Sequence, residues 1–162
     1  MAGTNWTPRL FLAEGIWSGT TAAVADGSFK DMQGTSGFTL IQEFSHQHIN
    51  GDNQVPGEDT DQASYRSELA GIYGVLLPAQ MVCKIYAIDT GHMVVACDNE
   101  SAAGQKAIEW HYPLKPANDH LDILSAIHQH CQQHPISMEF RHVEAHQREK
   151  YGPRNTLNKW AS

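Results

Sequence analysis

The sequence has few cysteines, no long apolar run and no recognisable targeting segment. Its three cysteines, Cys83, Cys97 and Cys131, are scattered and form no Cys-x-x-Cys pair, so a disulfide framework is not expected and a reducing compartment is the default. No apolar run approaches the roughly 18 residues that predict a transmembrane helix. The N-terminus lacks a basic stretch followed by an apolar one, so we expect an intracellular protein, cytoplasmic or nuclear, without a secretion signal.

Positive charge is also scarce. The 162 residues carry 11 Lys and Arg against 18 Asp and Glu, a formal net charge of -7 at pH 7. This balance excludes a generally basic protein that coats nucleic acid. It does not exclude a nucleic-acid enzyme with local basic contacts, because net charge does not say where the charges lie.

The apolar content is sufficient for one folded domain. Hydrophobic residues make up 41% of the 162 positions, which can fill a core, and the length suits a single domain. Residues 1–19 mix Trp, Pro and Gly without a period, and we interpret them as a leader segment. Residues 20–162 then form the domain.

Periodicity predicts both strands and helices in that domain. Strand-like runs at 20–28 and 34–44 flank a tight hairpin at 31–34. The other predicted strands are a short one near 53–55 and two at 92–97 and 136–143. This succession of strands and helices is typical of a mixed α/β layer.

The strongest predicted helix runs from Ser64 to about Ala87. Apolar residues recur there at three- and four-residue spacing, Ser64 is the N-cap candidate, and Pro78 could kink or split the helix. Further helices are predicted at 100–107, 119–133 and 156–162.

Three acidic residues stand at positions that suit catalytic chemistry. Asp26 lies at the end of the first strand, Glu68 on the first turns of the long helix, and Asp98 directly after a short apolar strand. A carboxylate among apolar residues is costly to bury unless it is paired or binds a cation. Three converging carboxylates would form an all-oxygen cage suited to Mg²⁺ or Mn²⁺. Taken singly, each could instead be a turn or helix-capping residue.

Four short stretches in a fixed order give the sequence a family resemblance. They are Asp26-Gly27-Ser28 followed by Gly34 and Gly37, then Arg66-Ser67-Glu68-Leu69-Ala70, then Val94 to Asn99, and then His142-Val143-Glu144-Ala145-His146-Gln147. With these motifs, residues 20–162 resemble ribonuclease H, and especially the ribonuclease H domain of a retroelement reverse transcriptase. The resemblance implies a ribonuclease-H-like α/β fold, with a mixed five-stranded sheet flanked by helices.

The resemblance also implies an activity and the residues that carry it. It implies hydrolysis of the RNA strand of RNA–DNA hybrids with two Mg²⁺ ions, for which Mn²⁺ could substitute. Asp26, Glu68 and Asp98 would hold the ions, and His146 would assist proton transfer or product release. The implied partners are the hybrid and the rest of a reverse transcriptase polyprotein, and no membrane is expected. Candidate contacts to the hybrid are Gly27, Ser28, Asn99 and Gln105.

The last segment departs from the family pattern. Ribonucleases H carry a fourth carboxylate on their last helix, whereas residues 156–162 contain no acid. In one alignment Asn158 takes the acidic position, which keeps an oxygen ligand for the metal and loses the charge. In the other alignment the last helix is truncated before the acid. The alternative to a weakened enzyme is a catalytically inactive ribonuclease-H-like relic or structural module of a retroelement polyprotein.

The ten histidines suggest a second kind of metal site. His130 and His134 are four residues apart, so a helix would place both on one face, where they could bind Zn²⁺. No second Cys or His pair stands at zinc-finger spacing, and His128 and Cys131 fit an apolar helix face. The pattern therefore favours packing over zinc binding.

Overall fold

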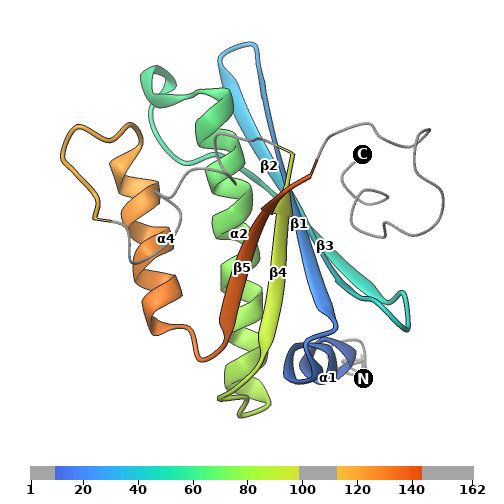
Figure 1. The fold of residues 1–162 in the computed structure, drawn as a ribbon. Coiled ribbons are helices and arrows are strands. Elements are labelled where there is room, and N and C mark those ends of the chain that lie inside the picture. The colour runs from blue at the N-terminus through green and yellow to red at the C-terminus, as the bar shows by residue number, and fades with distance from the viewer. Residues whose placement is uncertain (1–9, 99–112, 144–162) are drawn as a thin grey trace, which may run out of the picture.

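The computed structural model describes residues 10–98 and 113–143, which form one sheet with helices packed on it (Figure 1). The strands are β1 (Thr21–Lys30), β2 (Gln33–Gln42), β3 (His48–Gln54), β4 (His92–Cys97) and β5 (Ser137–His142). Their order across the five-stranded sheet is β3-β2-β1-β4-β5. The pairs β1–β2 and β2–β3 are antiparallel, and the pairs β1–β4 and β4–β5 are parallel. The predicted mixed five-stranded sheet flanked by helices is confirmed.

A two-residue turn joins β1 to β2, where the sequence predicts a tight hairpin. Lys30 pairs with Gln33, and the turn residues Asp31 and Met32 have φ values of 52° and 65°. Positive φ at both positions matches the right-handed twist of the strands, although Asn and Gly are the usual residues in such turns. The turn fixes the register in which Asp26 pairs with Gly37.

The edge strand β3 is longer than the sequence predicts. It begins at His48, well before the predicted strand near 53–55, and pairs with β2 from Thr35 to Ile41. Most of its residues are exposed. A strand that buries little of either face shows no clear apolar alternation, so periodicity does not reveal its full length.

The long helix α2 (Ser64–Ile85) supplies much of the core. Leu69, Ile72 and Leu76 are at most 1% exposed and belong to the main core cluster. Pro78 lies inside the helix without ending it. By length and composition α2 could also cross a membrane, but more than half of its most apolar stretch is buried inside the protein.

The first turn of α2 differs from the prediction. Ser64 is already helical, and the N-cap is Ala63, whose extended backbone (φ −158°, ψ 159°) makes no side-chain capping bond. Ser67 donates its hydroxyl hydrogen to the carbonyl oxygen of Ala63 at 3.1 Å. The predicted N-cap at Ser64 is therefore wrong by one residue, because the chain leaves the extended conformation one position earlier than a cap at Ser64 would require.

The segment predicted as an irregular leader contains a helix, α1 (Leu10–Ser18). Leu12 and Ile16 stand four residues apart and are fully buried in the main core cluster. The hydroxyl of Thr21 donates to the carbonyl oxygen of Leu12 at 3.4 Å. Residues 10–18 thus pack on the domain, and because most of them are apolar the segment shows no clear helical period.

The helix α4 (Leu121–Gln133) packs against α2, and a short 3-10 helix, η2 (Asp59–Asp61), precedes α2 (Figure 1). α4 begins two residues after the predicted position 119, because His120 adopts a left-handed conformation with φ 56° at its N-cap. The helices predicted at 100–107 and 156–162 lie outside the described residues. The buried residues of α4 are Ile123, Leu124, Ile127 and His128.

Candidate metal centre

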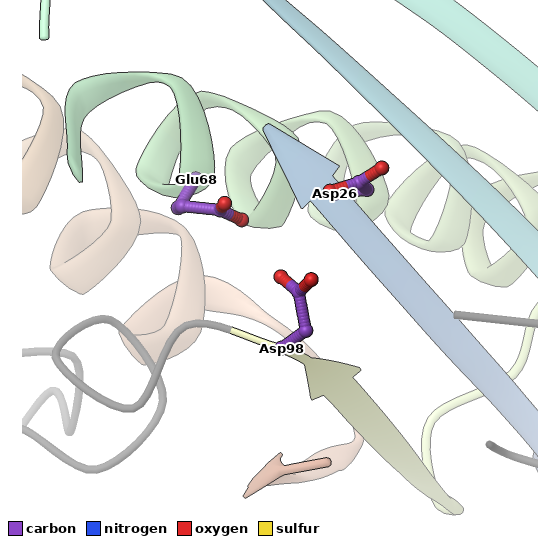
Figure 2. A group of neighbouring side chains, drawn as sticks. All are labelled: Asp26, Glu68 and Asp98. Carbon is purple, nitrogen blue, oxygen red and sulfur yellow. The ribbon is translucent and has the colours of Figure 1, made fainter. Parts of the chain in front are cut away.

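Asp26, Glu68 and Asp98 come together from three separate elements (Figure 2). Asp26 lies on β1, Glu68 on α2 and Asp98 directly after β4. Each offers a carboxylate oxygen, and these oxygens all lie within 4.8 Å of one another. The two aspartates meet because β1 and β4 are parallel neighbours, with Ala25 paired to Cys97. The structure therefore assembles the three carboxylates that the sequence singled out.

Two glycines allow α2 to approach β1 closely. A Cβ atom at Gly27 would overlap the backbone of Ser67 and Glu68, and a Cβ at Gly71 would lie only 3.0 Å from the carbonyl oxygen of Asp26. A larger residue at Gly27 would push the two backbones apart. Because these two glycines have no side chain, the strand that carries Asp26 and the helix that carries Glu68 can lie this close together.

Glu68 is the buried member of the cluster. It is 5% exposed, and its Oε2 atom has no hydrogen-bond partner. Burial, followed by the nearby carboxylates of Asp98 and Asp26, raises the pKa of Glu68 to about 8, against a hydrogen bond from the backbone N–H of Gly27. All of the charges that act on this group are negative, so a bound cation would supply the missing positive partner.

The donor set fits a hard divalent cation. Carboxylate oxygens are the ligands that Mg²⁺ and Mn²⁺ prefer, and the carboxylates of Glu68 and Asp98 point toward a common space beside Asp26 (Figure 2). Asp26 is exposed and Asp98 is half-buried, so solvent reaches this space.

The zinc hypothesis gains no support from the described part of the chain. Within residues 10–98 and 113–143, the acidic cluster is the only group of three or more His, Cys, Asp or Glu residues placed to hold a metal. His130 lies in the last turn of α4, whereas His134 is the extended C-cap residue that follows the helix, and no third ligand in the described ranges joins them.

The other predicted site residues fall into two sets. Gly27 and Ser28 follow Asp26 on β1, where Gly27 is half-buried and Ser28 is exposed. The predicted site residues that lie outside the described ranges are Asn99, Gln105, His146 and Asn158.

His142 makes a contact beside the cluster that the sequence did not predict. It ends β5, where it pairs with Cys97, and its Nε2 atom forms a 3.2 Å hydrogen bond with the backbone oxygen of Asp98. This bond helps to hold the backbone that presents the Asp98 carboxylate. The histidine belongs to a recognisable motif, but its contact depends on the pairing of β4 with β5.

The order and direction of the strands, with carboxylates gathered where β1 and β4 adjoin α2, define a ribonuclease-H-like architecture. LC11-RNase H1 in complex with an RNA/DNA hybrid matches this chain with a TM-score of 0.62 at 15% identity, over 85% of this chain and 92% of that one. A second structure of LC11-RNase H1, which was isolated from compost by a metagenomic approach, matches with a TM-score of 0.56 at 16% identity, over 77% and 84%. RNase H1 from the halophilic archaeon Halobacterium salinarum NRC-1 matches with a TM-score of 0.50 at 12% identity, over 76% and 85%.

These likenesses are structural, because no family model and no curated protein matches the sequence. This chain has the ribonuclease H fold, and its sequence is 12 to 16% identical to those of these RNase H1 structures.

Proposed function

We propose that this chain is a metal-dependent endonuclease of the ribonuclease H type, which hydrolyses the RNA strand of RNA–DNA hybrids by a two-metal mechanism. The observation that carries the proposal is the buried carboxylate of Glu68, which lies next to the carboxylates of Asp26 and Asp98. Its Oε2 atom has no hydrogen-bond partner. Three carboxylates in one space oppose folding unless a cation compensates them. The choice of substrate is supported by LC11-RNase H1, a structural neighbour that was solved in complex with an RNA/DNA hybrid.

Asp26, Glu68 and Asp98 would hold Mg²⁺, or Mn²⁺ in its place. Two bound ions would supply the activation of a water molecule and the stabilisation of the leaving 3′ oxygen. Glu68 is buried against the backbone of Gly27 and would offer a fixed ligand, whereas the two aspartates reach solvent and would face the incoming phosphate group. His146 would transfer a proton or assist product release.

Selection of the RNA strand would rest on its 2′-hydroxyl groups, which lie in an accessible minor groove. Ser28 is exposed on β1 two residues after Asp26, so its hydroxyl is available beside the reaction centre. The other proposed contacts are Gly27, Asn99 and Gln105. The motifs shared with retroelement domains support a further partner, the rest of a reverse transcriptase polyprotein.

A catalytically inactive module is the second candidate function. One observation favours it, the absence of an acidic residue from 156–162, where Asn158 offers only an uncharged oxygen. Removing a charged ligand weakens the binding of a hard cation. Such a module would keep the fold and would bind a hybrid or a polyprotein neighbour without cutting either.

A cleavage assay on matched nucleic acids tests the proposal. The purified chain is incubated in Mg²⁺ or Mn²⁺ with a labelled RNA–DNA hybrid, and separately with RNA duplex, DNA duplex and single-stranded RNA of the same sequence. We expect cleavage of the RNA strand of the hybrid alone, which EDTA and Asp26→Asn both abolish. Binding of the hybrid without cleavage in either metal would favour the inactive module. Cleavage of the DNA duplex would indicate a different nuclease activity on the same fold.

A further inference from the structure

Arg66 is a buried arginine in the first turn of α2, two residues before Glu68. It is 3% exposed. Its Nε atom donates to the carbonyl oxygen of Pro56 at 2.7 Å, and its two terminal nitrogens donate to the two carboxylate oxygens of Asp122 at 2.9 and 2.6 Å. Because Asp122 lies in the first turn of α4, one guanidinium ties the start of α2 both to the preceding segment and to another helix.

The Arg66–Asp122 pair has the geometry of a strong ion pair. Two parallel hydrogen bonds between a planar guanidinium and a carboxylate fix orientation as well as distance. The bonds from Arg66 lower the pKa of Asp122 to about 2, and the same pairing raises the pKa of Arg66. Both groups are therefore charged throughout the neutral range, and the link between the helices persists there.

Glu68 is subject to forces that favour moving it out of the cluster. Burial disfavours its charge, and the carboxylates of Asp98 and Asp26 repel it, while the backbone N–H of Gly27 donates a hydrogen bond that favours its ionised form. Arg66 is not among the groups that shift the pKa of Glu68. Arg66 and Glu68 are connected through the backbone of α2, on which they stand two residues apart.

We propose that the Arg66–Asp122 pair positions Glu68, by holding the first turn of α2 where the Glu68 carboxylate can share a divalent cation with Asp26 and Asp98. The inference rests on the proposed metal centre. It makes Arg66 and Asp122 positioning residues, which touch neither the metal nor the substrate. It also couples the placement of α4 to the metal affinity of the site, since α4 carries one half of the pair.

A second bidentate pair provides a matched control. On β5, Arg141 donates to the two carboxylate oxygens of Glu139 at 2.6 and 3.0 Å. Both residues lie on β5, and Glu139 also lies 3.6 Å from the Nε2 atom of His92 on β4, so these bonds connect β5 residues and β4 and none of them reaches α2. Asp122→Asn and Glu139→Gln each replace an arginine-bound carboxylate by its amide. Only Asp122→Asn weakens a bond to the start of α2. Asp122→Glu keeps the charge and both oxygens, and serves as the conservative variant.

Isothermal titration calorimetry with Mn²⁺, in the absence of nucleic acid, tests the inference on the folded variants. We expect Asp122→Asn to raise the Kd for Mn²⁺ about 3- to 10-fold, and Glu139→Gln and Asp122→Glu to stay within about twofold of wild type. Circular dichroism melts in EDTA report the stability of each variant separately.

Two results would overturn the inference and leave the metal centre standing. One is an unchanged Kd for Mn²⁺ in Asp122→Asn with a lowered melting temperature, which would assign the pair to stability alone. The other is an equal loss of affinity in Asp122→Asn and Glu139→Gln, which would reflect lost negative charge. Absence of Mn²⁺ binding by the wild-type chain would overturn the inference together with the proposed function.

Discussion

Glu68 is expected to destabilise the metal-free fold, because its carboxyl group is buried and lies close to two further carboxylates. Its unpartnered Oε2 atom and its pKa of about 8 describe the same condition, a carboxyl group whose ionised form has no positive partner. Groups perturbed both by burial and by specific charges gather at functional sites more often than elsewhere. At the scale of the residue, this carboxylate is therefore best explained as a ligand that a cation completes.

Glu68→Gln is expected to stabilise the metal-free protein and to abolish catalysis. The amide keeps the shape of the side chain and removes the charge that burial and repulsion disfavour, so the free energy of unfolding in EDTA at pH 7.5 should rise by about 1 to 3 kcal/mol. Urea denaturation measures this change. Mn²⁺ should raise the melting temperature of the wild type but not of the variant. A variant less stable than the wild type in EDTA would contradict this account of Glu68.

The burial of His134 should make the stability of the fold depend on pH. It is 9% exposed, and burial lowers its pKa to about 4. The unfolded chain, with an ordinary histidine pKa near 6.5, therefore takes up this proton first. The contribution of His134 to stability is greatest above about pH 6.5, and it should fall by at most about 3 kcal/mol as the pH drops to about 4.

The measurement is urea denaturation between pH 7.5 and pH 4.5. His134→Gln should remove this part of the pH dependence, whatever its effect at pH 7.5. The exposed His46, whose φ of 56° an asparagine tolerates, provides the control His46→Asn, which should retain the wild-type slope. Equal slopes in the wild type and His134→Gln would show that burial of this imidazole does not govern acid stability.

At the scale of elements, the approach of α2 to β1 decides whether Asp26 and Glu68 can meet. The contact is backbone against backbone, since a Cβ at Gly27 would overlap Ser67 and Glu68. Backbone atoms cannot rotate away as a flexible side chain can. The spacing between helix and strand is therefore more sensitive to one methyl group here than at an ordinary glycine.

Gly27→Ala is expected to destabilise the protein by at least about 2 kcal/mol and to abolish metal binding, because α2 must move away from β1. Gly37→Ala is the matched control. Gly37 pairs with Asp26 on the neighbouring strand, but a Cβ there meets only the carbonyl oxygen of Gly51 at 3.7 Å, an ordinary contact. Thermal melts and Mn²⁺ titrations compare the two variants. Similar behaviour of both would show that the close approach is not required.

Elements with strong periodicity could be predicted from the sequence, and those without it could not. The strand β4 and the start of α2 stand where the apolar spacing predicts them. The helix α1 could not be predicted because most of its residues are apolar, so they show no helical period. The full length of β3 could not be predicted because an exposed edge strand buries little. The spacing of apolar residues along the sequence reveals an element only when one of its faces is buried and the opposite face is polar.

The candidate site divides in a similar way. The three carboxylates could be predicted because each stands among small or apolar residues in its own local segment. The bonds of Arg66 to Asp122 and of His142 to the backbone of Asp98 join elements far apart in the chain. Such contacts depend on how helices and strands pack, which no local pattern specifies.

At the scale of the whole molecule, a protein of net charge -7 is proposed to bind a polyanion. The overall field opposes that association, so cations at the carboxylate cluster would have to offset repulsion as well as support chemistry. The cluster itself exists only in the assembled fold, because β1, α2 and β4 each contribute one ligand. Loss of the fold and loss of the metal centre should therefore coincide.

The absence of an acidic residue from 156–162 leads to a prediction for Asn158. If Asn158 occupies the family's acidic position, Asn158→Asp should lower the Mg²⁺ concentration for half-maximal activity about tenfold, which corresponds to roughly 1.4 kcal/mol. Asn50→Asp adds the same charge on β3 and should have no such effect. A magnesium titration of hybrid cleavage compares the three proteins. No change in Asn158→Asp would remove this residue from the metal centre.

Analysis of the products formed from a labelled RNA–DNA hybrid tests the central claim most directly. The wild-type chain is compared with Asp26→Asn, Glu68→Gln and Asp98→Asn, each with Mn²⁺ and with EDTA. We predict metal-dependent cleavage of the RNA strand that leaves 3′-hydroxyl and 5′-phosphate ends, lost in all three variants. Cleavage that survives in the variants, or that leaves cyclic phosphate ends without metal, would contradict a centre built on these three carboxylates.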